Sequence, residues 1–297
     1  MARFSLTEDV KRRFPWFIKI PLKIVLSRLP FRLRSWQRVN LFRAGAMDSP
    51  AYAWDIFKKH YQAVSVADLC DANVLELGPG NSLLTALFAK CHGAAKTWLI
   101  DGEHLTSEDA SLFARAEQML TELRVPVPGV GTASSMDGVL NQLNSRYLTS
   151  GLASLQTVGD GTIDFLFSNA VLEHVRLADF AEIIKQTRRV LKPTGVASHV
   201  IDFRDHLQNA LNNLRFSKRI WEADFMARSG FYTNRLTWPA MDRLFRENGF
   251  SVELRSFERW PDGLPTKQGR MAAPFKHMRP EELMISLAHV VLRPISR

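Results

Sequence analysis

A glycine-rich turn at residues 78–80 holds the first residues that could do chemistry. It follows a short apolar run that contains Glu76 and precedes a helical pattern of apolar residues. A strand, a tight turn and a helix in this order leave unpaired backbone N–H groups facing the turn. Gly78 and Gly80 have no Cβ atom, so a ligand can approach the main chain closely there. The spacing therefore predicts a site for a nucleotide-like ligand held partly by backbone groups.

A second candidate, Asp101, follows the apolar segment 97–100. In a β–α–β unit this position is the end of the second strand, where a carboxylate can accept hydrogen bonds from both hydroxyl groups of a ribose. A dinucleotide-binding turn would also place a small residue at position 83, but Leu83 stands there. An acid inside the first strand is likewise unusual for a dehydrogenase. The two motifs therefore favour a nucleoside ligand other than a dinucleotide.

Two later segments, residues 160–175 and 189–196, complete a set of motifs. Together with the glycine turn and Asp101, they resemble the motifs of class I S-adenosylmethionine-dependent methyltransferases. The branch that methylates small molecules and sugars is the nearest. Specific motifs cover about residues 70–200, and a looser likeness in strand order continues to the C-terminus. The second half also resembles methyltransferases found with bacterial surface-polysaccharide pathways.

The resemblance implies that S-adenosylmethionine is the cofactor and assigns it residues at the ends of three predicted strands. The first group would cradle the methionine end and the ribose edge, the second would hold the ribose hydroxyls, and the third would line the sulfonium. An acid near the adenine is common in this branch, but residues 149–155 contain none, which leaves Ser150 or backbone groups for that contact. The three groups are Glu76, Gly78, Pro79, Gly80, Asn81 and Ser82; Asp101 and Gly102, with Glu103 beside them; and Ser168, Asn169 and Ala170.

Methyl transfer from a sulfonium needs alignment and exclusion of water, and it needs a general base only when the acceptor must lose a proton. His206 is the main candidate for that base or for a substrate ligand, and a loop histidine that caps backbone groups is the alternative. A structural role for Glu173 is an equal alternative to a catalytic one. No metal site is predicted. The candidate catalytic residues are Glu173 and His174 after the fourth strand, and Asp202, Asp205 and His206 after the fifth.

Alternating apolar segments predict an α/β fold: a doubly wound, Rossmann-like sheet of seven strands with the order 3-2-1-4-5-7-6. The last strand is expected to be antiparallel, and a helical cap is expected at the N-terminus. Residues 134–162 give the weakest pattern, read as a helix, a short strand and then a loop. Strands are predicted near 73–77, 97–101, 147–149, 163–168, 196–201, 250–257 and 284–292, and helices near 49–66, 107–123, 136–145, 177–190, 206–228 and 237–248.

Charge divides the chain into a basic N-terminal cap, residues 1–70, and a methyltransferase domain, residues 71–297. The cap carries 13 of the 39 basic and 5 of the 30 acidic residues, which is nearly all of the net charge of +9. An aromatic-rich lid over the substrate is expected around residues 206–240. Four basic residues, Arg215, Lys218, Arg219 and Arg235, could meet an anionic acceptor or lie on solvated helix faces.

Residues 14–38 interleave apolar and basic side chains between prolines. They could pack on the fold as a cap or lie on an anionic bilayer, and both interpretations stay open. The two cysteines show no metal-ligand spacing, so a location in the reducing cytoplasm is expected. The alternative is a cytoplasmic protein that also contacts the inner face of the membrane peripherally.

The leading hypothesis is an O- or N-methyltransferase acting on a small molecule or glycan. The alternatives are an RNA methyltransferase that uses the basic arm and a non-catalytic S-adenosylmethionine-binding protein. Nucleic acid is the less favoured partner, because residues 168–171 differ from the Asn/Asp-Pro-Pro-aromatic motif of base-amine methyltransferases.

Overall fold

The computed structural model describes residues 46–64, 69–106, 109–133 and 135–295. Seven strands form one sheet with the order β3-β2-β1-β4-β5-β7-β6. The first five strands run parallel, and β7 is antiparallel to both of its neighbours. This confirms the predicted order and the antiparallel last strand. The strands are β1 (Asn73–Leu77), β2 (Lys96–Ile100), β3 (Ser145–Leu148), β4 (Ile163–Asn169), β5 (Leu191–Asp202), β6 (Phe250–Arg259) and β7 (Ile285–Pro294).

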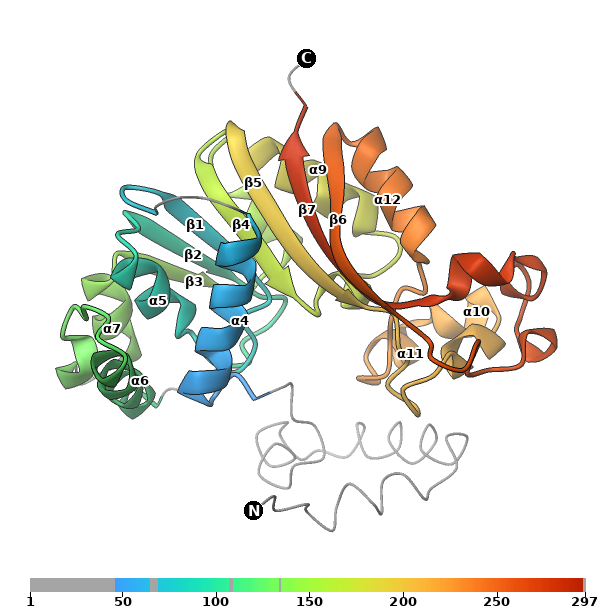
Figure 1. Ribbon diagram of the computed structural model, residues 1–297, viewed down its shortest axis with the longest axis horizontal. Helices are drawn as coiled ribbons and strands as arrows, with labels where there is room; N and C mark the ends of the chain where they lie inside the picture. Colours follow the sequence, from blue (N-terminus) through green and yellow to red (C-terminus); the bar gives the residue numbers. More distant parts are fainter. Residues whose placement is uncertain (1–45, 65–68, 107–108, 134, 296–297) are drawn as a thin grey trace, which may run out of the picture.

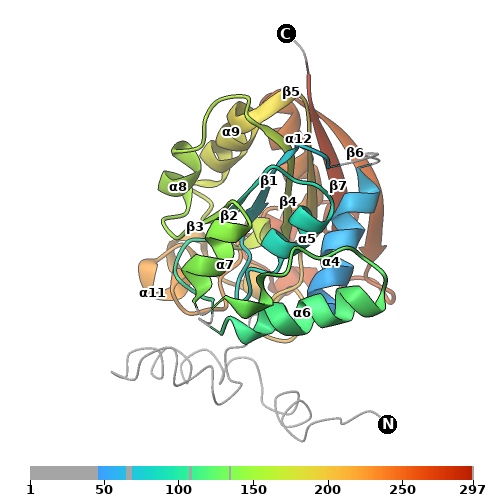
Figure 2. The same ribbon diagram turned by 90° about the vertical axis from the view of Figure 1, so that its left-hand side faces the viewer.

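Helices cover both faces of the sheet, as Figures 1 and 2 show. The helices α4 (Pro50–Ala63), α5 (Thr85–Cys91) and α6 (Ser111–Glu122) lie on one face. On the other face lie α8 (Leu152–Gln156), α9 (Phe180–Val190) and α12 (Trp238–Glu247). The short α7 (Met136–Gln142) packs beside β3. The fold is therefore doubly wound, as the alternation of segments predicted.

The central strands are apolar on both sides because both sides are covered. Along β4, Phe165 and Phe167 pack with the α4 side of the core, whereas Leu166 packs with the α9 side. All three side chains are fully buried. Successive side chains of a strand point to opposite faces, so an unbroken apolar run is expected only where helices cover both. This pattern fixes the register of β4 and, with it, the position of the residues at its carboxyl end.

The helical material predicted at 206–228 is found, but not as one continuous helix. The structure has only short turns there: η3 (Asn212–Arg215), α10 (Lys218–Trp221) and α11 (Asp224–Ala227). They wrap around the fully buried Trp221, which forms a small core with Leu207, Met226, Phe231 and Tyr232. The apolar residues are thus spaced to surround one indole ring rather than to line a helix face. The predicted loop after residue 149 is also partly wrong, because α8 occupies residues 152–156.

Two segments, 203–237 and 260–284, lie side by side beyond the carboxyl ends of β4 and β5 (Figure 1). The backbone N–H of Ala272 donates to the carbonyl of Leu214 at 2.9 Å, and that of Leu211 donates to Thr266 Oγ1 at 3.3 Å. A second small core, which contains Trp260, joins the two segments. We call these two segments the insert. It covers the edge of the sheet at which ligands of open α/β proteins bind.

Much of the predicted N-terminal cap, including the basic segment 14–38, lies outside the described residues. Its described part, α4, packs Trp54 and Phe57 into the main core, as expected of that aromatic stripe. No helix in the described ranges is both long and apolar enough to cross a membrane.

Three buried side chains link α4, β5 and β7 through the centre of the fold. Ser198 Oγ lies 2.8 Å from His60 Nδ1 and 2.9 Å from His289 Nε2. His60 Nε2 lies 3.4 Å from Asn169 Oδ1, at the end of β4. Because an amide oxygen only accepts, His60 donates from Nε2, Ser198 donates to His60, and His289 donates to Ser198. The chain of hydrogen bonds therefore requires a neutral His60, because its Nδ1 must accept.

Burial lowers the pKa of His60 well below its usual value and that of His289 to about 4. Between pH 4 and 6.5 the unfolded chain binds a proton at His289 that the folded chain does not bind. Acidification through this window therefore favours unfolding by up to about 1.4 kcal/mol per pH unit for each such histidine.

We expect His289→Gln to remove one histidine from this pH dependence, because glutamine still offers a donor to Ser198 but does not titrate. Urea unfolding at several pH values should show that the wild type loses free energy of unfolding relative to the variant between pH 6.5 and 4. The matched control is His277→Gln at an exposed histidine, which should stay parallel to wild type. Parallel curves for His289→Gln would contradict the neutral network.

Candidate functional site

The turn after β1 has the open backbone that its glycines predicted, but the two glycines serve different needs. Both lie in the left-handed region, with φ of +72° at Gly78 and +69° at Gly80. A Cβ atom on Gly78 would stand 2.4 Å from Val171 Cγ2, whereas one on Gly80 would meet no atom within 4 Å. Gly78 is therefore required for packing against the turn after β4. Gly80 borders open space.

Asp101, just after β2, is tied to this turn. Its Oδ2 accepts from the N–H of Gly80 at 3.1 Å, and its Oδ1 accepts from the N–H of Gly102 at 2.8 Å. Desolvation by burial raises the pKa of the carboxyl, while these two amides oppose that rise. Each carboxylate oxygen has a second lone pair. The side chain can therefore brace the turn and still accept hydrogen bonds from a ligand.

Two buried oxygens near the turn have no hydrogen-bond partner among the described residues: Glu76 Oε2 and Asn81 Oδ1. Glu76 is 1% exposed, and desolvation raises its pKa to about 8. Buried polar atoms in native proteins are nearly always hydrogen-bonded, so these two mark a place that a polar ligand or water completes. Pro79 and Ser82 are buried in the same turn, and Ser82 Oγ accepts from the N–H of Leu84 at 3.3 Å.

The residues at the end of β4 point in different directions. The Ser168 hydroxyl is fully buried and lies 2.7 Å from His199 Nδ1, inside the core. Asn169 is half-buried and contacts His60, as described above. Ala170 has φ of +53°, which is uncommon for a residue with a Cβ atom. Of these three positions, the side chain of Asn169 and the backbone of Ala170 are available at the carboxyl edge.

A short turn after β4, η2 (Leu172–His174), carries Glu173 and is held by Asn234 of the insert. Asn234 Nδ2 donates to the carbonyls of Leu172 and Val175, and its backbone N–H donates to that of Glu173. Glu173 is 2% exposed. Its Oε1 accepts from the N–H of Asp202 at 3.2 Å, which links the ends of β4 and β5. Desolvation raises the pKa of Glu173 to about 8.

His174 and His206 stack face to face, with ring centroids 4.8 Å apart and Nε2 atoms 3.1 Å apart. His174 Nδ1 lies 3.0 Å from the carbonyl oxygen of Tyr232. Since that oxygen only accepts, His174 carries its proton on Nδ1 and accepts from His206 Nε2. Desolvation lowers the pKa of His174, which keeps it neutral. The lone pair of neutral His206 is then on Nδ1.

The two aspartates after β5 have different partners. Asp202 is half-buried and forms a two-pronged ion pair with Arg204, at 2.8 and 2.9 Å. Asp205 is fully buried, and its carboxylate accepts four backbone N–H groups. These amides belong to Leu207, Gln208, Ala210 and Asn212. The contacts of Asp205 therefore serve the loop rather than an open site.

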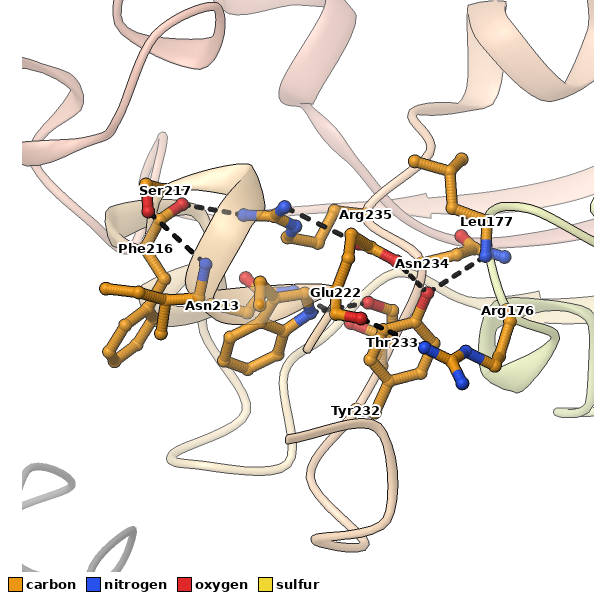
Figure 3. A network of polar contacts seen from close by, with 12 residues as sticks. Arg176, Leu177, Asn213, Phe216, Ser217, Glu222, Tyr232, Thr233, Asn234 and Arg235 are labelled. Atoms are coloured by element: carbon orange, nitrogen blue, oxygen red, sulfur yellow. Dashed lines mark hydrogen bonds and ion pairs between the residues drawn. The ribbon is translucent and has the colours of Figure 1, made fainter. Parts of the chain in front are cut away.

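Figure 3 shows the polar network that holds the insert. The phenolic O–H of Tyr232 donates to Glu222 Oε2 at 2.7 Å and accepts from the N–H of Leu177 at 2.9 Å. Arg235 donates to the carbonyl of Phe216 at 2.7 Å and lies 3.5 Å from Glu222 Oε1. Of the four basic residues considered for an anionic acceptor, Arg235 is thus paired inside the insert. Lys218 and Arg219 are exposed.

Sequence reasoning did not find His60, Ser198 and His289, although they reach Asn169. Their hydrogen bonds join positions 91 and 138 residues apart, and no local pattern relates such positions. It placed Asn234 in the expected lid without giving it a role, and it did not name Glu222; the importance of both comes from what they contact. The only feature of the sequence that could have indicated these residues is the presence of polar side chains within otherwise apolar segments.

A family model described as a methyltransferase domain matches residues 48–254. No curated protein sequence matches this chain.

Several solved structures are similar in fold at low sequence identity. The YcgJ protein from Bacillus subtilis is 14% identical, with a TM-score of 0.45 over 80% of this chain and 97% of that one. A putative S-adenosylmethionine-dependent methyltransferase from Listeria monocytogenes is 16% identical, with a TM-score of 0.45 over 83% and 98%. The 1,6-didemethyltoxoflavin N1-methyltransferase from Burkholderia thailandensis is 15% identical, with a TM-score of 0.42 over 85% and 80%.

We expect Asp205→Asn to destabilise the insert, because an amide in place of the carboxylate leaves at least one buried N–H without an acceptor. Such a loss costs about 1–3 kcal/mol of the free energy of unfolding. Urea unfolding and hydrogen exchange of the 205–212 amides measure it. Gln208→Ala is the matched control at an exposed neighbour and should change stability by no more than about 0.5 kcal/mol. Equal stability of both variants would exclude the structural role of Asp205.

Proposed function

The chain belongs to the methyltransferase domain family, and on this premise we propose that it methylates an oxygen or nitrogen atom of a small molecule or glycan. The methyl donor is S-adenosylmethionine. The proposal is supported by one observation: the carboxyl edge of the sheet has two different parts, one suited to the cofactor and one suited to the acceptor. An open glycine turn with unpartnered buried oxygens lies at β1 and β2, and an insert with its own polar groups lies over β4 and β5. An acceptor in surface-polysaccharide synthesis would fit this class.

The residues at β1 and β2 fit the cofactor. Gly80 borders open space, Asp101 has unused lone pairs, and Glu76 and Asn81 each have a buried oxygen without a partner in the described part of the chain. We assign the ribose hydroxyls to Asp101. Glu76 and Asn81 are assigned to the polar methionine end, together with backbone groups of residues 78–82. Gly102 stands beside Asp101, and its N–H keeps that carboxylate in place.

The acceptor side lies over β4 and β5. When bound, the cofactor supplies an activated methyl group, so the chain's own residues mainly have to align the acceptor and exclude water. Asn169 and the backbone of Ala170 end β4 beside Glu173, and Glu173 ties that end to β5. The insert covers this edge, as expected of a substrate lid. We therefore place the acceptor between the end of β4 and the insert.

For an acceptor that must lose a proton, we propose His206 as the general base and His174 as the residue that positions it. The Tyr232 carbonyl fixes the tautomer of His174, and His174 in turn accepts from His206 Nε2. In this proposal the imidazole of His206 takes the proton from the acceptor. Asp205 has no part in this step, because backbone amides occupy its carboxylate. Asp202 keeps Arg204 in place beside the same loop.

We expect Asp101→Asn to weaken S-adenosylhomocysteine binding at least tenfold. It removes charge-assisted hydrogen bonds worth about 1.5–3 kcal/mol each, and about 1.4 kcal/mol corresponds to a tenfold change. Calorimetric titration of the folded variant measures this. Asp262→Asn, at an exposed position outside the proposed cofactor site, is the control and should bind as wild type does. Unchanged affinity in Asp101→Asn would refute the ribose assignment.

The function itself is tested by measuring S-adenosylhomocysteine release with a panel of phenols, sugars, amines and RNA. We expect turnover with a small hydroxyl or amine compound and none with RNA. Turnover with RNA alone would favour a nucleic-acid acceptor.

On an active hydroxyl acceptor, His206→Ala should lower kcat by about 10²–10⁴-fold, the usual effect of losing a general base, and leave cofactor affinity unchanged. Gln208→Ala, at an exposed position in the same loop, is the control. Near-wild-type turnover by His206→Ala would eliminate it as the base.

A further inference from the structure

A small cavity of about 30 Å³ lies between the end of β5 and the insert. Its polar lining includes Glu173, Asn213 and Arg235, and its apolar lining includes Leu214, Trp238 and Ile285. A space of this size holds one water molecule or one group of similar size. It is on the acceptor side of the proposed site, because Glu173 follows β4 directly and hydrogen-bonds to the end of β5.

Among the polar residues of the lining, three have an atom without a hydrogen-bond partner in the described part of the chain. The atoms are Glu173 Oε2, Asn213 Oδ1 and Arg235 Nε, and all three are buried. Only eight such side-chain atoms occur in the described part of the chain, so three of the eight belong to residues lining one small cavity. Because native interiors leave few polar groups unsatisfied, this concentration indicates that another molecule completes the set.

The surrounding contacts fix what each residue offers. Asn213 Nδ2 donates to Thr233 Oγ1 at 2.9 Å, which leaves the amide oxygen as an acceptor. The Arg235 guanidinium lies between the rings of Trp221 and Phe275, 5.6 and 5.4 Å from their centroids. Its terminal nitrogens bind Phe216 and Glu222, so Nε remains as a donor. The side chains are therefore held in place before any ligand arrives.

The backbone at Arg235 supports a functional role. Its φ of +61° lies in the left-handed region, which is costly for a side chain of this size. The buried network of Figure 3 holds the residue in this conformation. Strained backbone of this kind concentrates at ligand-binding sites, where the surrounding structure maintains it.

The charges of the cavity balance. Glu222 pairs with Arg235, and two acids of the lining, Asp202 and Glu282, pair with Arg204 and Arg279. The raised pKa of Glu173, about 8, keeps its carboxyl mostly protonated at neutral pH. A buried anion or ammonium would therefore find no free opposite charge. A hydroxyl group satisfies all three residues, because it can accept from the Glu173 carboxyl and from Arg235 and donate to Asn213.

We propose that Glu173, Asn213 and Arg235 form a specificity pocket that binds an uncharged hydroxyl group of the acceptor, separate from the atom that is methylated. The proposal rests on the proposed function and narrows it: the acceptor carries at least two polar positions, and the one in this pocket is neutral. This chemistry suits a sugar ring or another polyol.

The test is ligand-observed NMR on the full chain saturated with S-adenosylhomocysteine. The probes are methyl α-glucopyranoside, its uronate analogue and its 2-amino analogue. We expect the neutral glycoside to give the strongest saturation transfer. Stronger binding of either charged analogue, or binding of none of the three, would overturn the proposal; with no binding, the cavity holds only water.

Variants of Glu173 separate recognition from packing. Glu173→Leu should raise the Kd for the neutral glycoside at least tenfold. Glu173→Gln should restore it, because the amide still donates to a hydroxyl. The matched control is Glu281→Leu at an exposed position outside the pocket, which should bind as wild type does. Unchanged binding by Glu173→Leu would refute the pocket.

A second variant and a cofactor-binding measurement distinguish failure of the pocket from failure to fold and from failure of the proposed function. If Glu173→Leu does not fold, Asn213→Ala carries the same expectation of a tenfold loss, and unchanged binding by that variant refutes the pocket equally. Calorimetry with S-adenosylhomocysteine alone is run on every variant. Normal cofactor binding with glycoside binding that is insensitive to these residues contradicts only the pocket, whereas absent cofactor binding in wild type contradicts the proposed function as well.

Discussion

The hydrogen bonds of Asn234 hold together the two halves of the site. Its side chain donates to two carbonyls of the turn after β4, and its backbone donates to a third. That turn begins next to the cofactor side of the sheet and ends under the insert. Without these bonds, three carbonyls at the edge would lack donors, and the insert would keep fewer hydrogen bonds to this turn, such as that between His174 and the Tyr232 carbonyl. Asn234 is 2% exposed, so solvent does not compensate for such a loss.

Two buried carboxyl groups show how the same fold serves two kinds of ligand. Glu76 lies at the end of β1 and Glu173 just after β4, and desolvation raises the pKa of each to about 8. Each has one oxygen without a partner among the residues described. A carboxyl group left this way destabilises the empty fold, since burial without a full set of partners is unfavourable. In the proposed site, ligand binding would relieve the penalty at both positions, one on the cofactor side and one on the acceptor side.

The sequence predicted what depends on local patterns. The glycine turn, Asp101 and the apolar strands have their expected places, and the strand order is confirmed. The residues of the insert could not be placed in the same way. Its turns are held by Asp205, which caps four amides, and by the indole of Trp221, and neither arrangement has a periodicity. The contact of Ser168 with His199 could not be predicted either, because it depends on the pairing of β4 with β5.

The division between the two sides also explains why the acceptor is harder to identify than the cofactor. Cofactor contacts come from strand ends and tight turns, where backbone geometry dictates residue type, as the φ of Gly78 and its contact with Val171 show. The acceptor contacts that we propose depend on long-range pairs such as Asn213 with Thr233 and Arg235 with Glu222. Those pairs lie in the insert, which can change without disturbing the sheet. The acceptor's chemistry is thus decided by a few polar atoms that the insert leaves unpaired, and by the charges that it has already neutralised around them.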